Sequence, residues 1–176
     1  MALIVLSLAG CASAPPPPWE PEAAKLIRVG TVQVDEVQRM VIASGYVNQV
    51  DGAIELFACG KRGKTHESVL VLSAYPVDLH AALLLLGAKC GAPASGLGVG
   101  PPRGDDLAIW VEWVDEGTRR VVRAEELAAF RRNGRKLSRT DWVFTGSTFE
   151  DGKYKALVEE SLVATYWDPW AVINIR

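Results

Sequence analysis

The stretch IELFACGKRGKTHESVLVL, from Ile54 to Leu72, places two β-type runs on either side of a charged segment. Ile54–Phe57 and Ser68–Leu72 are rich in β-branched, aromatic and aliphatic side chains, which is typical of strands. The charged segment between them is typical of a turn in which Thr65 and Ser68 form local hydrogen bonds with the backbone. We therefore expect this part of the chain to contribute strands to a sheet.

A helical pattern follows these strands. Residues Val77–Ala88 are rich in Ala and Leu, begin after Pro76 and reach Gly87, which is the composition and punctuation of a helix. Because the segment is apolar nearly all round, we expect it to be largely buried. A second, amphipathic helix is predicted over residues 124–132, with glutamates in its first turn and arginines in its last. This helix should lie on the surface.

Further strand-like runs lie on both sides of this region, separated by Asp-Gly and Glu-Gly turn signals. They are Val32–Val34, Met40–Ala43, Ala108–Val114, Asp141–Thr145, Tyr154–Leu157 and Leu162–Trp167. A chain of 176 residues is long enough for one domain with a sizeable core. The sequence predicts an α+β fold: one strand-rich domain with an antiparallel sheet, a buried helix at about 77–88 and a short surface helix at about 124–132.

The N-terminal residues MALIVLSLAGC resemble a bacterial lipobox, in which cleavage before the cysteine leaves that residue lipidated. The apolar run from Ala2 to Leu8 is too short to span a bilayer. After Cys11, the four prolines of Pro15–Pro18 predict an extended polyproline tether. We therefore predict a signal peptide at residues 1–10, a lipidated cysteine and tether at 11–24, and a folded domain at 25–176.

This organisation predicts a protein of the cell envelope that is lipid-anchored and faces the periplasm or the exterior. The membrane is then a partner through lipid on Cys11. A net charge of -2 gives no global attraction to nucleic acid, and nucleic acid is not expected for an exported protein. The basic stretch at residues 119–139 leaves a protein or an anionic envelope polymer open as a further partner.

Four residues are candidates for a metal or other functional site: Cys59, His66, Glu67 and His80. Their thiolate, imidazole and carboxylate groups would suit zinc, although the spacing matches no compact zinc motif. Cys59 is alternatively a nucleophile whose thiolate form is favoured by three nearby cations. In an oxidising compartment, a disulfide between Cys59 and Cys90 is a third hypothesis. Inert alternatives remain: a charged turn around His66, and a neutral His80 in a buried helix, hydrogen-bonded to the backbone or to a carboxylate.

Four blocks in order carry a family resemblance: Leu56–Cys59, Lys64–Ser68, His80–Ala88 and Trp142–Ser147. They are similar to the YdjY-like domain of uncharacterised exported or lipid-anchored bacterial proteins. The resemblance implies a shared fold and an envelope location, and it brings no established activity.

The sequence therefore favours a lipid-anchored envelope protein whose domain is a binding or assembly module. The alternative is an envelope metal-binding protein or metal-dependent enzyme that uses Cys59, His66, Glu67 and His80. No cofactor is required by the sequence, and a divalent metal such as zinc is the one that these side chains would accept. Whether the chain is an enzyme is left open.

Overall fold

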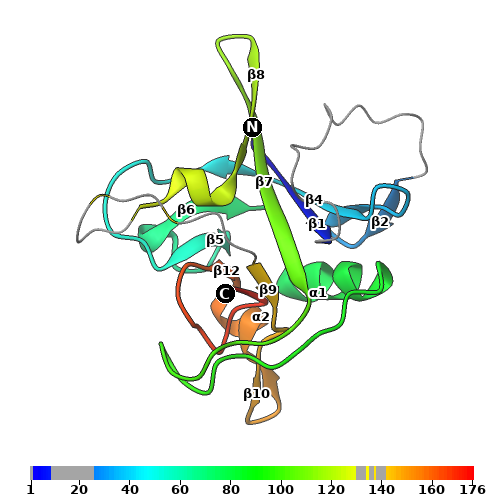
Figure 1. Ribbon diagram of the computed structural model, residues 1–176, viewed down its shortest axis with the longest axis vertical. Helices are drawn as coiled ribbons and strands as arrows, with labels where there is room; N and C mark the ends of the chain where they lie inside the picture. The colour runs from blue at the N-terminus through cyan, green and yellow to red at the C-terminus, as the bar shows by residue number, and fades with distance from the viewer. Residues whose placement is uncertain (1, 9–25, 130–133, 135–136, 138–141) are drawn as a thin grey trace.

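The computed structural model describes residues 2–8, 26–129, 134, 137 and 142–176. Eight strands form a closed barrel, because the first strand pairs with neighbours on both of its edges (Figure 1). In spatial order they are β1 (Ala2–Leu8), β7 (Asp106–Asp115), β9 (Trp142–Phe144), β13 (Ile173–Ile175), β12 (Ser161–Ala164), β5 (Leu56–Gly60), β6 (Ser68–Leu72) and β4 (Met40–Val47).

Other strands extend or decorate this barrel. Strands β3 (Val32–Asp35) and β2 (Ile27–Val29) continue outward from β4. Strand β8 (Thr118–Arg123) pairs with β7, and their hairpin projects from the body in Figure 1. Strands β10 (Phe149–Glu150) and β11 (Lys153–Tyr154) form a separate two-stranded hairpin.

The predicted fold class is wrong, because the described chain forms a closed, mixed barrel instead of an α+β antiparallel sheet. Strands β5 and β6 are parallel neighbours, as are β12 and β13. Only Lys61–Glu67 connects β5 to β6, and such a short connection ordinarily joins antiparallel strands. This segment, which includes the 3₁₀ turn η1 (Thr65–Glu67), instead returns the chain so that Leu56 pairs with Ser68.

Helix α1 (Pro76–Leu85) begins where the sequence predicts, but it is not a buried helix. Leu79, Ala82 and Leu83 pack into the main core, whereas Leu84 and Leu85 are each 48% exposed. The helix therefore covers the barrel with one side only. The sequence did not predict this one-sided burial, because a helix that is apolar on all sides does not show which face packs against the core.

The predicted surface helix at 124–132 is also wrong over the residues that are described. A 3₁₀ turn, η2 (Ala124–Leu127), stands in its place, and its first two residues are buried. Residues 130–132 of the prediction lie outside the described residues. In the part of the chain that the structure describes, the other α-helix is α2 (Lys155–Glu159), which replaces most of a predicted strand at Tyr154–Leu157.

The main core joins side chains of the barrel strands to those of α1 and β3, and in it the Phe57 and Trp142 rings lie 5.7 Å apart. A second apolar cluster contains Val5, Met40, Ile42 and Trp110. Alternation along the strands explains the two clusters, since successive side chains point to opposite faces of a sheet. The barrel is consequently covered by apolar contacts on both faces where β1, β4 and β7 meet.

The N-terminal segment predicted as part of a signal peptide forms β1 in this structure. The predicted lipidation site Cys11 and the tether at 11–24 lie outside the described residues. Among the helices of the described ranges, none has the length and apolar character needed to cross a membrane.

Candidate functional site

The short connection between β5 and β6 is held in place by one buried carboxylate. Glu160 is 4% exposed, and its Oε2 atom accepts a 2.8 Å hydrogen bond from the backbone N–H of Arg62. Its Oε1 atom accepts a 2.7 Å bond from Arg62 Nε and lies 2.7 Å from a terminal guanidinium nitrogen. The carboxylate thus fixes both the backbone and the side chain at the start of the connection.

Two backbone features aim Glu160 at this connection. Glu160 caps the C-terminus of α2 in a left-handed conformation, with φ of 49°. At Gly60, a side-chain Cβ would overlap the Glu160 carboxylate, so glycine allows the close approach. The hydrogen bond from Gly60 N–H to Glu160 O, at 2.8 Å, joins the same two segments.

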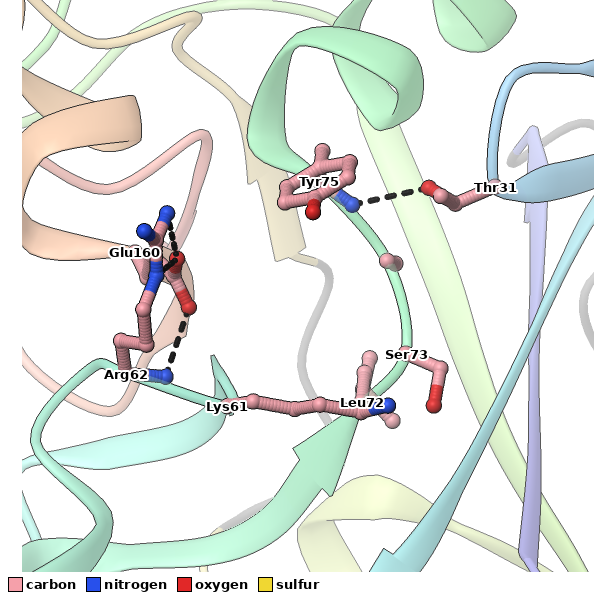
Figure 2. Close-up of a pocket in the computed structure, with 8 residues that line it drawn as sticks. Thr31, Lys61, Arg62, Leu72, Ser73, Tyr75 and Glu160 are labelled. Atoms are coloured by element: carbon pink, nitrogen blue, oxygen red, sulfur yellow. Dashed lines mark hydrogen bonds and ion pairs between the residues drawn. The ribbon is translucent and has the colours of Figure 1, made fainter.

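A hollow of about 470 Å³ opens beside this ion pair. It is lined by Thr31, Lys61, Arg62, Leu72, Ser73, Ala74, Tyr75 and Glu160. In Figure 2, Lys61 extends along one side of the hollow toward Leu72 and Ser73. Arg62 folds back onto Glu160, and Tyr75 and Thr31 lie across from them. We call this hollow the Lys61 pocket.

The rim of the Lys61 pocket is fixed from the N-terminus of α1. Thr31 Oγ1 donates a 2.6 Å hydrogen bond to Asp78 Oδ2 and accepts a 2.9 Å bond from the backbone N–H of Tyr75. The Thr31 backbone N–H also donates to Asp78 Oδ2, at 2.8 Å. These bonds hold the loop that carries Thr31 against the residue that precedes the helix.

The residues that line the Lys61 pocket include two cations, Lys61 and Arg62, and one carboxylate, Glu160, while the Asp78 carboxylate at the rim is bonded to Thr31. Glu160 compensates the guanidinium of Arg62, and the same contact raises the Arg62 pKa, chiefly through the hydrogen bond. Among the residues that the structure describes, no carboxylate forms an ion pair with Lys61. The hydroxyls of Ser73 and Tyr75 are likewise available as donors, since both residues line the hollow and are exposed. This arrangement can bind an anionic group by one ammonium and two hydroxyls.

A second polar cluster lies on the other side of α1, around Gly146. His80 Nδ1 and the Tyr154 hydroxyl are 3.0 Å apart. The Cys90 thiol donates a 3.4 Å hydrogen bond to the Thr145 carbonyl oxygen. A Cβ at Gly146 would overlap Cys90 Sγ and lie 3.0 Å from His80 Cε1, so both side chains pack against this glycine. The structure thus brings His80 to Cys90, whereas the sequence hypothesis joined it to Cys59.

The surroundings of this cluster favour the uncharged forms of its groups. Burial lowers the pKa of His80, and a hydrogen bond with the Gly146 backbone opposes part of that effect. Burial raises the pKa of the Cys90 thiol and that of the Tyr154 phenol. A thiol with a raised pKa has little thiolate, so Cys90 is not an activated nucleophile.

The predicted metal ligands are dispersed. Cys59 is completely buried in β5 within an apolar cluster, and burial raises its pKa. His66 is exposed, with Nε2 3.9 Å from a Glu67 carboxylate oxygen, while Glu67 forms a 3.1 Å ion pair with Lys64. Within the described ranges, no three His, Cys, Asp or Glu residues are grouped to hold a metal ion.

The predicted Cys59–Cys90 disulfide is absent from the structure. Cys59 is buried and Cys90 is exposed, and both are free thiols. Cys59 lies in the cluster with Leu56, Val71 and Ala171, whereas Cys90 packs against Gly146. The two cysteines therefore belong to different parts of the fold.

Sequence reasoning missed the residues that build the Lys61 pocket. Lys61 and Arg62 were considered only as cations beside Cys59, and Tyr75 was not considered at all. Glu160 lies 98 residues from Arg62, and nothing local in the sequence marks it as the partner. The one available signal was the concentration of cations in the connection after β5.

The comparison with protein families agrees with the four residue blocks that resemble the YdjY-like domain. A family model described as the YdjY domain matches residues 32–173. Searches of the curated proteins and of the solved structures found no match. The matched region spans most of the chain and runs from β3 to the first residue of β13, with the Lys61 pocket almost entirely inside it. The chain therefore belongs to the YdjY domain family.

Proposed function

We propose that this protein is a binding module of the cell envelope, held by lipid on Cys11, whose Lys61 pocket binds a ligand bearing a carboxylate or phosphate group. The observation that carries the proposal is the Lys61 ammonium, which lines the hollow without an ion-pair partner among the described residues. An ammonium in such a setting attracts an anion, and neighbouring hydroxyls supply hydrogen bonds.

The Arg62–Glu160 pair has a positioning role in this proposal. Because Glu160 takes up both the Arg62 backbone N–H and its guanidinium, the connection after β5 is rigid before a ligand arrives. A preformed site spends little binding free energy on ordering its own side chains. Lys61 is then the side chain that contacts the anion, and Glu160 acts through the backbone that carries Lys61.

The anchoring half of the proposal is supported by sequence. The order of apolar run, small residues and Cys11, followed by prolines, is that of a lipidated protein on a tether. Membrane attachment would then pass through the lipid, and the domain would present its pocket to a protein or an envelope polymer with anionic groups. Metabolic labelling with a fatty acid tests this half, because label that survives Cys11→Ser would contradict it.

The pocket is tested by calorimetric titration of the full chain carrying Cys11→Ser with inorganic phosphate and, separately, with glucuronate as a carboxylate probe. We expect at least one probe to bind, with an affinity that falls as salt rises, since exposed charges are screened. Lys61→Ala should abolish the binding and Lys61→Arg should retain part of it. Lys153→Ala, which removes an exposed lysine outside the pocket, is the matched control. Equal affinity in Lys61→Ala and Lys153→Ala would overturn the pocket assignment.

A further inference from the structure

Strand β1 is an interior strand of the barrel, paired along both edges. It runs antiparallel to β4, from Ala2 opposite Gly45 to Ser7 opposite Met40. It also runs antiparallel to β7, from Ala2 opposite Trp113 to Leu8 opposite Leu107. Figure 1 shows this short strand lying against β4 and β7. The backbone of one seven-residue segment thus closes the ring.

The side chains at the middle of β1 are buried on both faces of the sheet. Leu6, 1% exposed, belongs to the main core with Val41 and Ile109. Val5, 2% exposed, belongs to the other cluster with Ile42 and Trp110. The position between β4 and β7 consequently selects apolar side chains at two successive residues, and a charge at either would be buried without a partner.

The same residues precede the predicted cleavage point before Cys11. If the chain is processed there, as the proposed function requires, β1 leaves the protein in one piece. Strands β4 and β7 would then each present a row of unpaired N–H and C=O groups, beside apolar side chains that β1 had covered. An edge of this kind is a template for an added strand.

We propose that the position left by β1 is a strand-acceptor groove, which after processing takes an extended, uncharged, apolar segment of about seven residues from a partner protein. The incoming segment runs antiparallel to both β4 and β7, as β1 does, and places apolar side chains at its two central positions. This inference rests on the proposed processing before Cys11. The groove would recognise its partner through backbone hydrogen bonds and apolar side chains, and not through anionic groups.

The groove can be tested in the full chain with one inserted cut site. A protease recognition sequence is placed between Ala14 and Pro15 of a Cys11→Ser protein that retains residues 1–10, and the purified chain is cut in solution. A fluorescent peptide with the β1 sequence ALIVLSL, flanked by lysines for solubility, is then added, and its binding is followed by fluorescence anisotropy. Sheet content is followed in parallel by circular dichroism.

The cut protein should bind the peptide, and the uncut protein should not. In the uncut chain β1 competes at an effective concentration of about 1 mM, so peptide at about 10 µM should occupy the groove roughly a hundredfold less. Two control peptides sharpen the result. One carries Leu6→Asp, which puts a charge at a buried position, and the other keeps every side chain but has a methylated backbone nitrogen at Leu6, which removes a hydrogen-bond donor. Both should bind at least about tenfold more weakly than the original peptide.

The opposite results are equally definite. Equal binding by cut and uncut protein would overturn the groove. So would a cut protein that has lost the β1 fragment and keeps its sheet signal without binding peptide, because β4 and β7 would then pair directly. If cutting unfolds the protein, recovery of the sheet signal on adding the peptide supports the proposal and failure to recover overturns it. If Cys11 carries no lipid, both the proposed anchor and the removal of β1 by processing are wrong. If Cys11 is lipidated but the cut protein does not bind the peptide, only the proposed groove is wrong.

Discussion

Gly146 provides a direct test of the packing around His80, through substitution by alanine. Its φ is 78°, in the left-handed region, and its backbone N–H donates a 2.9 Å hydrogen bond to the Val172 carbonyl oxygen. An added Cβ would overlap Cys90 Sγ and lie 3.0 Å from His80 Cε1. Gly87 is a matched position, because its φ is 80° and an added Cβ there would meet nothing within 4 Å.

The two alanine variants separate backbone strain from steric overlap. A left-handed conformation costs an L-residue about 1 to 2 kcal/mol, and this cost applies equally to Gly87→Ala and Gly146→Ala. Overpacking a filled site adds about 1 to 3 kcal/mol, and this applies only at Gly146. The free energy of unfolding should therefore fall by about 1 to 2 kcal/mol in Gly87→Ala and by about 2 to 5 kcal/mol in Gly146→Ala.

Urea-induced equilibrium unfolding measures this difference through the transition midpoints, provided that the slopes agree. Adding Cys90→Ala to Gly146→Ala should restore part of the loss, because it removes the sulfur that the new methyl group meets. Equal losses in the two glycine variants, or no recovery in the double variant, would show that Cys90 and His80 do not pack against Gly146 as described.

Three further predictions concern other features of the fold. Because burial holds the His80 pKa below 6.5, the unfolded chain binds a proton more readily than the native one, and the free energy of unfolding should fall as the pH drops below about 6.5. In a series of urea titrations at different pH, His80→Gln should reduce this dependence on pH, and His66→Gln serves as the control. In a Cys11→Ser protein, Cys90 should react with a thiol reagent in the native state and Cys59 only after unfolding; rapid reaction of both would contradict the burial of Cys59. Glu160→Ala should lower the free energy of unfolding by about 1 to 3 kcal/mol, because the Arg62 N–H loses its acceptor, and an unchanged urea midpoint would contradict that role.

Strand positions could be predicted from this sequence, but their pairing could not. The runs at Val32–Val34, Met40–Ala43 and Ser68–Leu72 fall in β3, β4 and β6, since β-branched and aliphatic residues favour a pleated surface. Pairing direction depends on contacts between segments far apart in the chain. The parallel β5–β6 pair shows this, because its short connection is stabilised by Glu160, which lies far along the sequence.

The candidate site residues illustrate the same limit. The predicted strand ended at Phe57 and left Cys59 in the charged segment, whereas Cys59 lies within β5 and its thiol is completely enclosed. The alternative of a neutral His80 named the backbone or a carboxylate as its hydrogen-bond partner, whereas the side chain that its Nδ1 contacts is the Tyr154 hydroxyl, 74 residues away. Residue type alone therefore identified a polar group in the fold, and only the tertiary structure identified its partner.

Helix α1 connects the Lys61 pocket and the cluster around Gly146, and its geometry makes them separable. Asp78 holds Thr31 at the pocket, and His80 contacts Tyr154 in the cluster. Two positions along a helix correspond to a rotation of roughly 200°, so these side chains leave α1 in nearly opposite directions. Gly146→Ala should consequently lower the free energy of unfolding while leaving anion affinity at the Lys61 pocket unchanged in the folded protein, since distant sites without shared partners act independently. Calorimetric titration of that variant measures this directly, and a weakened affinity would mean that α1 shifts as a body and couples the two sites.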